Sequence, residues 1–470
     1  MKNYKYQELY DQLERGISQG EYEVGDKLPS LRFMANNHGL SIQTVMTTYH
    51  KLEENGLIKA NERSGYSILD TPNNKSYIDN QTSCNGKLAR PLDDIELLEN
   101  FFEHSNNEKF VNLGSLIPHP SFFNKTQVNG EIRKILNQDS GSFFNYGEPQ
   151  GNKKFKKFLL NKYAKNKSAE RDCFTTNGTL NSIFLALSAV CKPGDVVAIE
   201  SPIYFGFKFM LESLGVKTLS IKSLPHTGMT VEQLKRVYKK NKFKAIILIS
   251  SFSNPTGALV SNDEKEKIVR LAEDKKFFIM EDDVYGELHF NKQRPHRYLD
   301  YDKTGKVFYC NSVSKIISPA LKVGWLIIPK EYTRKINILK LGQLGAISPA
   351  LEEVAKNLLK SKKIQLKIRR SAKTYQENIS KVQHYFKQYG DGKFKTSNPQ
   401  GGFCLWIEGP AELDSLDLYS RLLEDKIVIA PGALFSTSGQ FNNFFRLNCA
   451  FEDFSAIKKS LLKIIELASL

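Results

Sequence analysis

The chain has 470 residues, of which 40% are hydrophobic and 25% are charged, so it is long enough for two or three domains and too apolar to be disordered. No apolar run approaches the roughly 20 residues that cross a bilayer, and the polar N-terminus is unlike a signal peptide. We therefore expect a soluble, cytoplasmic protein without a membrane partner. Its six cysteines lack a CxxC pair or a nearby histidine, which argues against a zinc site, a disulfide framework or any other metal centre.

The net charge of +16 is unevenly distributed. Residues 1–70 hold eight Lys and Arg against ten Asp and Glu, or −2, which leaves +18 for the remaining chain. A basic balance attracts polyanions, but here it lies outside the segment in which a DNA-binding pattern occurs. Net charge alone is therefore weak support for DNA binding, and many lysines fit a solvated surface.

The first 70 residues predict three helices followed by a hairpin of two short strands over 57–68. The second helix begins after Pro29 and Ser30 and ends at Gly39, and Ser41 caps the third. Apolar residues at helical spacing form the inward faces of the first and third helices: Tyr6, Leu9, Tyr10, Leu13, Ile17, Val45, Tyr49 and Leu52.

Helices in this order, followed by a β wing, place a recognition helix in the major groove of DNA. The string GDKLPSLRFMANNHGLSIQTVMTTYHKLEENGLI, followed by ERSGYSI, resembles the GntR family of winged helix-turn-helix regulators. The resemblance implies contacts to double-stranded DNA from the second helix, the start of the third and the wing, by Arg32, Ser41, Gln43, Thr44, Arg63 and Gly65. The family usually has an arginine where this chain has Ile42, so operator sequences do not transfer.

Residues 71–109 are polar and irregular, end in an acidic stretch that could form a short helix, and predict a linker. From 110 to 470, short apolar runs such as VVAIES, AIILIS, FFIMED and VGWLIIP alternate with helical segments. This alternation predicts an α/β domain with a mainly parallel sheet. Residues from about 350 to 470 predict a smaller α+β subdomain.

From about residue 110 onward the chain resembles the class I aminotransferases of fold type I, through NYGEPQG, TTNGTL, ESPIYFG, SSFSNPTG, EDDVYGEL and SVSKIISPALKVGW. The resemblance implies pyridoxal 5'-phosphate as cofactor, held by Lys315 as a Schiff base. Asp282, which precedes Lys315 by 33 residues (315 − 282), would pair with the pyridine nitrogen, while Tyr285 and Asn254 would bond the ring hydroxyl. Asp283 could exchange roles with Asp282, although the three-residue step to Tyr285 favours Asp282.

Further contacts follow from the same resemblance. The start of a helix suits a phosphate through its free N–H groups and its dipole. Lys322 stands where the family has an arginine that binds this phosphate. The single ammonium group of the lysine therefore replaces a planar guanidinium group. The remaining cofactor positions are Asn177, Gly178 and Thr179 for the phosphate, Tyr204 for ring stacking, Ser312 of the S-x-S-K string, and Tyr146, which in the family reaches the phosphate of a second subunit.

Arg446 matches the family arginine that grips an α-carboxylate by a bidentate, charge-assisted pair. A structural salt bridge is the alternative interpretation for this residue, and a place in the ordinary core is the alternative for Tyr204.

A GntR-like head on an aminotransferase-like body is the arrangement of the MocR subfamily. The resemblance implies a head-to-tail homodimer that regulates transcription in response to an amino compound, which displaces Lys315 and forms an external aldimine, or to the cofactor itself. A catalytically active aminotransferase that carries a DNA-binding head is the alternative, because every catalytic position that can be placed is filled.

Overall fold

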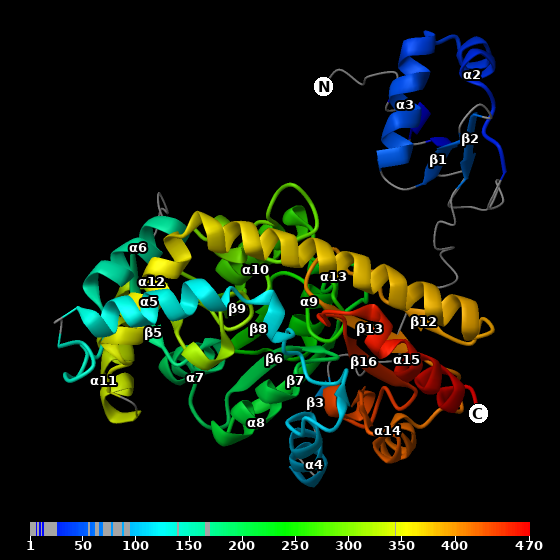
Figure 1. Cartoon of the computed structure of the whole chain (residues 1–470). Helices are drawn as coiled ribbons and strands as arrows, with labels where there is room; N and C mark the ends of the chain where they lie inside the picture. Colours follow the sequence, from blue (N-terminus) through cyan, green and yellow to red (C-terminus); the bar gives the residue numbers. More distant parts are fainter. Residues whose placement is uncertain are drawn as a thin grey trace. The chain divides into compact units, whose positions relative to one another are not determined.

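The computed structural model describes residues 6, 9, 10, 12, 13, 26–54, 57–61, 65–68, 77, 78, 87, 88, 95–138, 141–164, 170–343 and 345–470. The chain forms two compact units, residues 1–77 and 78–470, which we call the head and the body (Figure 1). Among the described residues, no helix has the length and apolarity that a membrane span requires.

The head consists of α2 (Leu31–His38), α3 (Ile42–Glu54), β1 (Ile58–Asn61) and β2 (Gly65–Ile68) around residues of the first predicted helix. Ser30 caps α2 by accepting a hydrogen bond from the amide of Phe33 at 3.3 Å, and Gly39 ends it with φ of 60°. β1 and β2 pair antiparallel. The predicted inward residues that the structure describes lie in one core, except for Tyr6, which is half-buried; the core comprises Leu9, Tyr10, Leu13, Val45, Tyr49 and Leu52. Ile17 lies outside the described residues.

The body is built on an eight-stranded sheet of order β3-β7-β6-β8-β9-β10-β11-β5. The strands from β7 to β10 in this order run parallel, β11 is antiparallel to both of its neighbours, and the edge strand β3 is antiparallel to β7. The strand bounds are β3 Lys87–Leu88, β5 Arg171–Thr176, β6 Val196–Ser201, β7 Lys217–Lys222, β8 Ala245–Ile249, β9 Phe278–Asp282, β10 Val307–Ser312 and β11 Gly324–Pro329. The predicted, mainly parallel α/β domain is confirmed.

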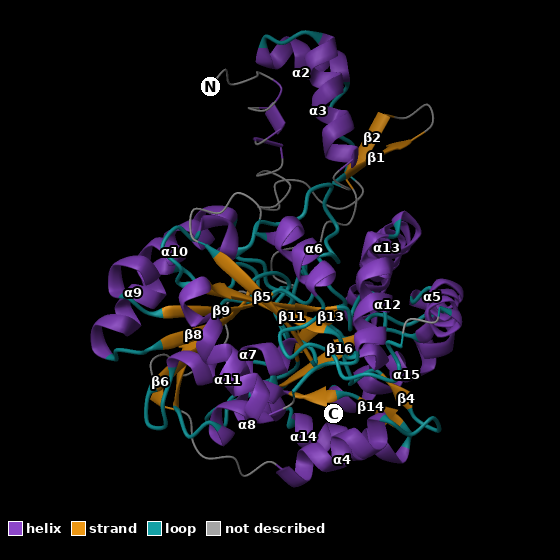
Figure 2. Ribbon diagram, turned by 90° about the vertical axis from the view of Figure 1, so that its left-hand side faces the viewer, coloured by secondary structure: helices purple, strands orange, loops and turns teal. Residues whose placement is uncertain are grey.

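Helices cover both faces of this sheet: Figure 2 shows α6 and α10 on one side and α7 and α11 on the other. Most of the strands are buried along their whole length, as parallel strands between helical layers are. The helix bounds are α5 Lys125–Asn137, α6 Lys153–Tyr163, α7 Thr179–Val190, α8 Phe205–Ser213, α9 Val231–Lys240, α10 Asn262–Lys275, α11 Thr333–Gln343 and α12 Pro349–Lys360. Short 3-10 helices occupy Pro120–Phe122, Tyr298–Tyr301, Pro319–Leu321, Lys330–Tyr332 and Gly432–Phe435.

A second core belongs to the C-terminal subdomain, where a four-stranded sheet of order β12-β13-β16-β15 packs against helices. Its elements are α13 Lys362–Tyr389, β12 Lys395–Thr396, β13 Cys404–Glu408, α14 Ser415–Glu424, β14 Ile427–Val428, β15 Ala430–Pro431, β16 Phe444–Asn448 and α15 Phe454–Ala468. The expected α+β subdomain is therefore present.

The segment predicted as a linker contributes to the body. α4 (Ile95–Ser105) buries Leu98 and Phe101 in the second core, and β4 (Val111–Asn112) pairs with β14. The two apolar residues stand three positions apart, which is enough for one buried helix face. Compact structure thus begins earlier than the predicted boundary at 110, and β3 already joins the main sheet.

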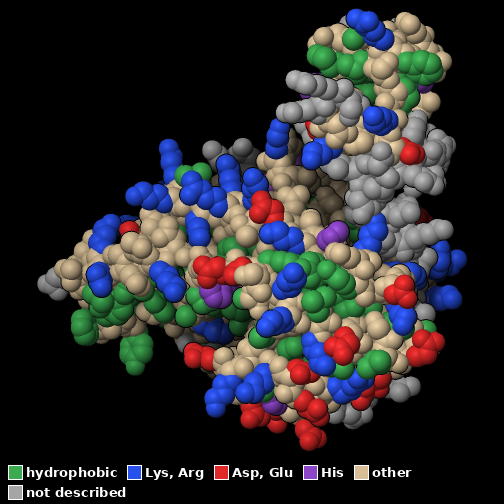
Figure 3. Space-filling model, turned by 45° about the vertical axis from the view of Figure 1, so that its right-hand side comes forward, with side chains coloured by type: hydrophobic (Ala, Val, Ile, Leu, Met, Phe, Trp, Pro, Cys, Tyr) green, Lys and Arg blue, Asp and Glu red, His purple; other side chains and the backbone are tan. Residues whose placement is uncertain are grey.

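The charge of the body is spread over its surface. On the face shown in Figure 3, lysine and arginine side chains are scattered over the upper part of the body, and acidic side chains gather toward its lower edge. This distribution fits the interpretation of many lysines as a solvated surface.

Asp302 joins two strands that carry site residues. Its carboxylate accepts hydrogen bonds from the amides of Gly305, Lys306 and Val307 at 2.8–3.0 Å and pairs with Arg171 of β5, and both charges are buried. Arg171 also donates to the carbonyl of Val307 at 2.8 Å. The start of β10 is thereby tied to the far edge of the sheet.

Replacing Asp302 with alanine should lower the free energy of unfolding of the body by about 3–5 kcal/mol, because Arg171 would remain buried without a counter-charge. Urea unfolding of the full chain measures this change. Glu232→Ala, which breaks an exposed pair with Lys235, is the control and should have no measurable effect. An Asp302→Ala protein that unfolds like the wild type would contradict the assignment.

Candidate functional site

The predicted cofactor residues follow the carboxyl ends of neighbouring strands. Tyr204 follows β6, Asn254 follows β8, Asp282 ends β9 and Ser312 ends β10, three residues before Lys315. Since carboxyl ends of parallel strands meet at one edge of a sheet, this edge is where an α/β fold binds ligands. The structure therefore gathers these residues from well-separated stretches of sequence.

Lys315 is placed as a reactive amine. Its Nζ donates a hydrogen bond to the carbonyl of Leu116 at 2.6 Å. Burial, together with the positive charges of Arg446 and Lys322 and against the opposing effect of Asp282, lowers the pKa of this amine to about 8. Roughly a tenth of the amine is therefore unprotonated at pH 7, and the unprotonated form is the one that reacts with a carbonyl group.

The structure separates the roles of the two adjacent aspartates. Asp283 accepts hydrogen bonds from Ser250 Oγ at 3.1 Å and Tyr309 OH at 2.7 Å, and it pairs with Arg294. Asp282 accepts from the amide of Val284 at 3.1 Å, and burial raises the pKa of its carboxyl group to about 7. Asp283 is committed to a structural network, so Asp282 is the carboxylate available to a ring nitrogen.

Arg446 lies on β16 with 1% of its surface exposed. One terminal nitrogen donates to Asn254 Oδ1 at 2.7 Å and the other to the carbonyl of Gly114, while its Nε has no partner within the described part of the chain. No described carboxylate pairs with it, and burial lowers its pKa. A salt bridge therefore does not account for this arginine, whereas an anionic ligand would compensate its buried charge.

The turn before α7 fits a phosphate group. Gly178 has φ of 93° at the helix N-cap, and the hydroxyl of Thr179 is buried without a partner among the described residues. A Cβ atom on Gly324 would lie 2.6 Å from the Cα of Gly178, so β11 presses directly against this turn. Free N–H groups and an unsatisfied hydroxyl at a helix N-terminus suit an anion, with Lys322 nearby as the basic group.

The other predicted cofactor residues differ in position. Tyr204 is half-buried between the two cores. Its ring packs closely against Gly206, because a Cβ atom added to that glycine would lie 2.5 Å from a ring carbon of Tyr204. Tyr285 is buried, and Ser312 Oγ accepts from the amide of Ser314 at 3.4 Å. Tyr146 is fully exposed, so it does not contribute to the site of its own chain.

Two carbonyl groups that sequence reasoning missed accept hydrogen bonds from Lys315 and Arg446. They belong to Gly114 and Leu116, and we call residues 114–116 the strap. A Cβ on Gly114 would lie 2.8 Å from the backbone of Ile429 and 2.9 Å from the ring of Phe101, so the glycine is required by close packing. The only signal in the sequence is that glycine within VNLGSLIP.

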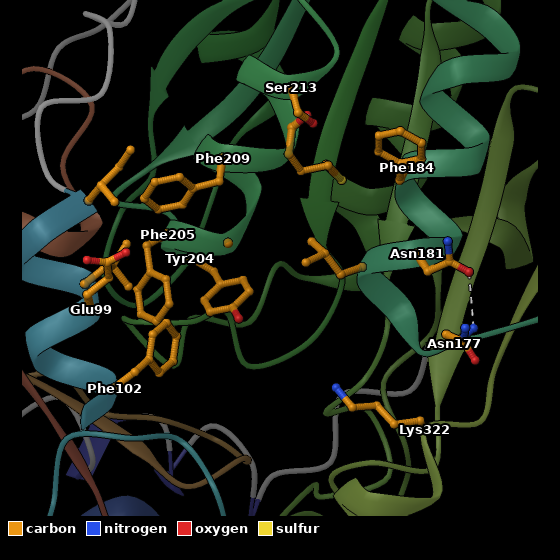
Figure 4. Close-up of a pocket in the computed structure, with 15 residues that line it drawn as sticks. Glu99, Phe102, Asn177, Asn181, Phe184, Tyr204, Phe205, Phe209, Ser213 and Lys322 are labelled. Carbon is orange, nitrogen blue, oxygen red and sulfur yellow. Dashed lines mark hydrogen bonds between the residues drawn. The ribbon is translucent and has the colours of Figure 1, made fainter. Parts of the chain in front are cut away.

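A cavity of about 700 Å³ opens beside the site, between α4, α7 and α8. Figure 4 shows Lys322 at one end of the cavity and Tyr204 beside Phe205. Asn177, whose backbone amide donates to Asn181 Oδ1 at 3.2 Å, lies on the side of α7. The cavity therefore continues from the candidate phosphate turn.

In the head, Arg32, Ser41 and Gln43 are exposed and Thr44 is half-buried. Ser41 Oγ accepts from the amide of Thr44 at 3.1 Å and caps the third helix as predicted. Gly65 is exposed with φ of 84°, a conformation that favours glycine in the wing. The predicted contact residue Arg63 lies outside the described residues.

Comparison with known proteins matches both units. Residues 117–459 match the family of class I and II aminotransferases, and residues 5–68 match the gntR family of bacterial regulatory proteins. The uncharacterized HTH-type transcriptional regulator YjiR of Escherichia coli is 32% identical over 467 residues, which is 98% of each chain. The chain is a MocR-type regulator. A further MocR-type relative, the HTH-type transcriptional regulator NorG of Staphylococcus aureus, is 24% identical over 93% of this chain and 98% of its own.

Solved structures confirm the fold type I body of this MocR-type regulator. Kynurenine aminotransferase of Pyrococcus horikoshii superposes with a TM-score of 0.73 at 23% identity, covering 81% of this chain and 94% of that one. The α-aminoadipate aminotransferase LysN of Thermus thermophilus gives a TM-score of 0.72 at 22% identity, over 79% and 94%. The aminotransferase family implies pyridoxal phosphate as the cofactor, and the unpartnered Thr179 hydroxyl and Arg446 Nε fit that group and a carboxylate ligand.

Gly324→Ala should weaken pyridoxal phosphate binding by at least about tenfold, because a backbone clash with Gly178 displaces the phosphate turn. Binding of pyridoxal, which lacks the phosphate, should change little. Absorbance titration of the cofactor-free protein measures both affinities. Gly342→Ala, which meets no atom within 4 Å, is the control. Equal loss for both compounds would show that the turn does not hold a phosphate.

The rate at which cofactor-free protein captures pyridoxal phosphate should rise with pH with a midpoint near pH 8, since only the neutral amine of Lys315 reacts. Arg446→Gln removes a charge that lowers this pKa, so the midpoint should move to higher pH. Stopped-flow absorbance across a pH series measures the midpoint. A midpoint that moves to lower pH, or does not move, would contradict the electrostatic coupling.

Proposed function

We propose that this protein is a cytoplasmic, pyridoxal-phosphate-dependent transcription regulator that binds double-stranded DNA and senses an amino compound, or the cofactor itself, through Lys315. The observation that carries the proposal is the buried guanidinium of Arg446, which faces the same site as Lys315 and has no described counter-ion. In a chain with a GntR-type head, a site that binds an amine and an anion together serves best as a sensor.

The cofactor, when bound, supplies an aldehyde that condenses with primary amines. Lys315 provides the amine that holds it, and Arg446 binds the carboxylate of an incoming ligand by a charge-assisted pair. The groups that orient the cofactor are Asp282 at the ring nitrogen, Asn254 and Tyr285 at the ring hydroxyl, Tyr204 at the ring face, and Asn177, Gly178, Thr179, Ser312 and Lys322 at the phosphate end.

We further propose that the strap can adopt two states. In the structure, Lys315 donates to Leu116 and Arg446 donates to Gly114. Both donors are the groups that cofactor and ligand engage, so occupancy competes directly with the strap. In chain order, the strap comes after α4 and β4, and these two elements come after the segment that connects them to the head. A ligand that favours the released strap shifts the equilibrium by its difference in affinity for the two states.

A second copy of the chain completes the proposal. Tyr146 and Phe144 are 104% and 92% exposed, as residues that act on a partner subunit would be. A head-to-tail homodimer would also present two heads to two half-sites on DNA.

Titration of the pyridoxal-phosphate-loaded protein with amines and amino acids, followed by visible absorbance and by anisotropy of labelled operator-region DNA, tests the sensor. We expect one class of compound to give a stable spectral shift and to change the DNA affinity by roughly 5-fold or more. Lys315→Ala should abolish both responses and leave cofactor-independent DNA binding intact.

Rapid conversion of the cofactor to its pyridoxamine form, reversed by a keto acid, would instead support an active aminotransferase that carries a DNA-binding head. The filled set of site residues favours this second function as well. A change in absorbance with no change in DNA affinity would contradict the sensor, and an active aminotransferase would then be the remaining function.

A further inference from the structure

The cavity beside the cofactor site is walled mainly by apolar side chains from three helices. α4, α7 and α8 contribute Leu98, Phe102, Leu180, Phe184, Phe209 and Met210. Phe102 and Leu180 are 47% and 40% exposed, so apolar surface is open to solvent at this place. The volume of the cavity, about 700 Å³, falls within the range of small-molecule sites, roughly 300–1,000 Å³.

The cavity is continuous with the candidate cofactor site. Tyr204, Asn177 and Lys322 belong to its lining and also to the predicted cofactor contacts. In Figure 4, Tyr204 lies between the aromatic side of the cavity, marked by Phe102 and Phe205, and the Lys322 end. Lys315 and Arg446 are not among the lining residues, so these three shared residues are the basis for placing the side chain of a ligand held at Lys315 in the cavity.

The charges of the lining favour some side chains over others. Lys322, at the cofactor end, is basic, and Glu99, on α4, is the acidic group among the described lining residues. A second carboxylate on the ligand would meet the like charge of Glu99 and the desolvating aromatic wall. An aromatic ring would instead cover Phe102 and Leu180 and remove their apolar surface from water, which is favourable in proportion to the area covered.

We infer that the amino compound sensed by this protein carries an aromatic side chain, or an apolar one of similar size, which occupies the cavity between α4, α7 and α8. The inference rests on the proposed function and names the ligand class of the same site. The walls belong to both cores: α4 packs in the C-terminal subdomain, where Asn100 Oδ1 accepts from Tyr419 OH at 2.9 Å, while α7 packs in the main core. A ligand side chain in this cavity would contact both the C-terminal subdomain and the main core. The size of the ligand would therefore affect the packing of one against the other.

Paired titrations of the pyridoxal-phosphate-loaded, full-length protein test the inference. The pairs are 2-phenylethylamine against ethylamine and L-phenylalanine against L-alanine, with L-aspartate as the acidic comparison. Half-saturation of the spectral shift should come at a concentration at least about tenfold lower for the phenyl compound in each pair, and L-aspartate should bind more weakly than L-alanine.

Phe184→Ala and Phe209→Ala should raise the half-saturating concentration of the phenyl compounds and leave that of ethylamine and L-alanine unchanged. Tyr389→Ala, which removes a 45% exposed ring outside the cavity, is the matched control and should change neither. Equal responses to the two members of each pair in the wild type would overturn the inference.

A readout without amine chemistry separates this inference from the proposed function. 3-Phenylpropionate cannot react with the cofactor, and saturation-transfer NMR should detect its phenyl protons on the wild type but not on Phe184→Ala or Phe209→Ala. Binding of this probe without any spectral response to amines would support the cavity and contradict the sensor. Spectral responses to amines without preference for phenyl compounds would support the sensor and contradict the assignment of the cavity. Dissociation of a dimer by Phe209→Ala with unchanged selectivity would overturn the inference in favour of a second copy of the chain as the occupant.

Discussion

The body is organised around a positive charge that none of the described carboxylates neutralises. Arg446 is almost completely buried, and its described partners are neutral: the side chain of Asn254, the carbonyl of Gly114 and the ring face of Phe435, whose centroid lies 4.8 Å from the guanidinium carbon. Such a charge persists only where the surrounding fold holds it in place. Residues from three distant parts of the chain converge on it, and its charge also helps to lower the pKa of the Lys315 amine.

Much of this arrangement was predictable because local chemistry determines it. The capping of α2 by Ser30 and Gly39, the buried face of α3 and the buried parallel strands follow from short patterns, whereas Asp282, Lys315 and Asn254 were named through the resemblance to aminotransferases. Spacing left open whether Asp282 or Asp283 serves the ring nitrogen. The contacts of Asp283 with Arg294 and Tyr309, which favour Asp282 for that role, depend on tertiary packing.

The strap illustrates what sequence patterns omit. The carbonyls of Gly114 and Leu116 act through the backbone, which every residue type carries, so no side-chain motif marks them. The sequence suggested a short helix in the acidic stretch where α4 lies, but not that Leu98 and Phe101 pack it into the second core. The size of the cavity between α4, α7 and α8 likewise depends on how three helices pack, and no single string contains that information.

The hydrogen bonds from Lys315 and Arg446 to one strap have a consequence for how the threshold of a sensor can evolve. In the proposed sensor, the stability of the strap would set how much ligand is needed to displace it, whereas the walls of the cavity would set which ligand is accepted. Residues near 114–116 that touch no ligand would then shift the working concentration while the choice of ligand stays the same. Sensitivity and selectivity would thus lie in different parts of the chain, and each could change by point mutation without compromising the other.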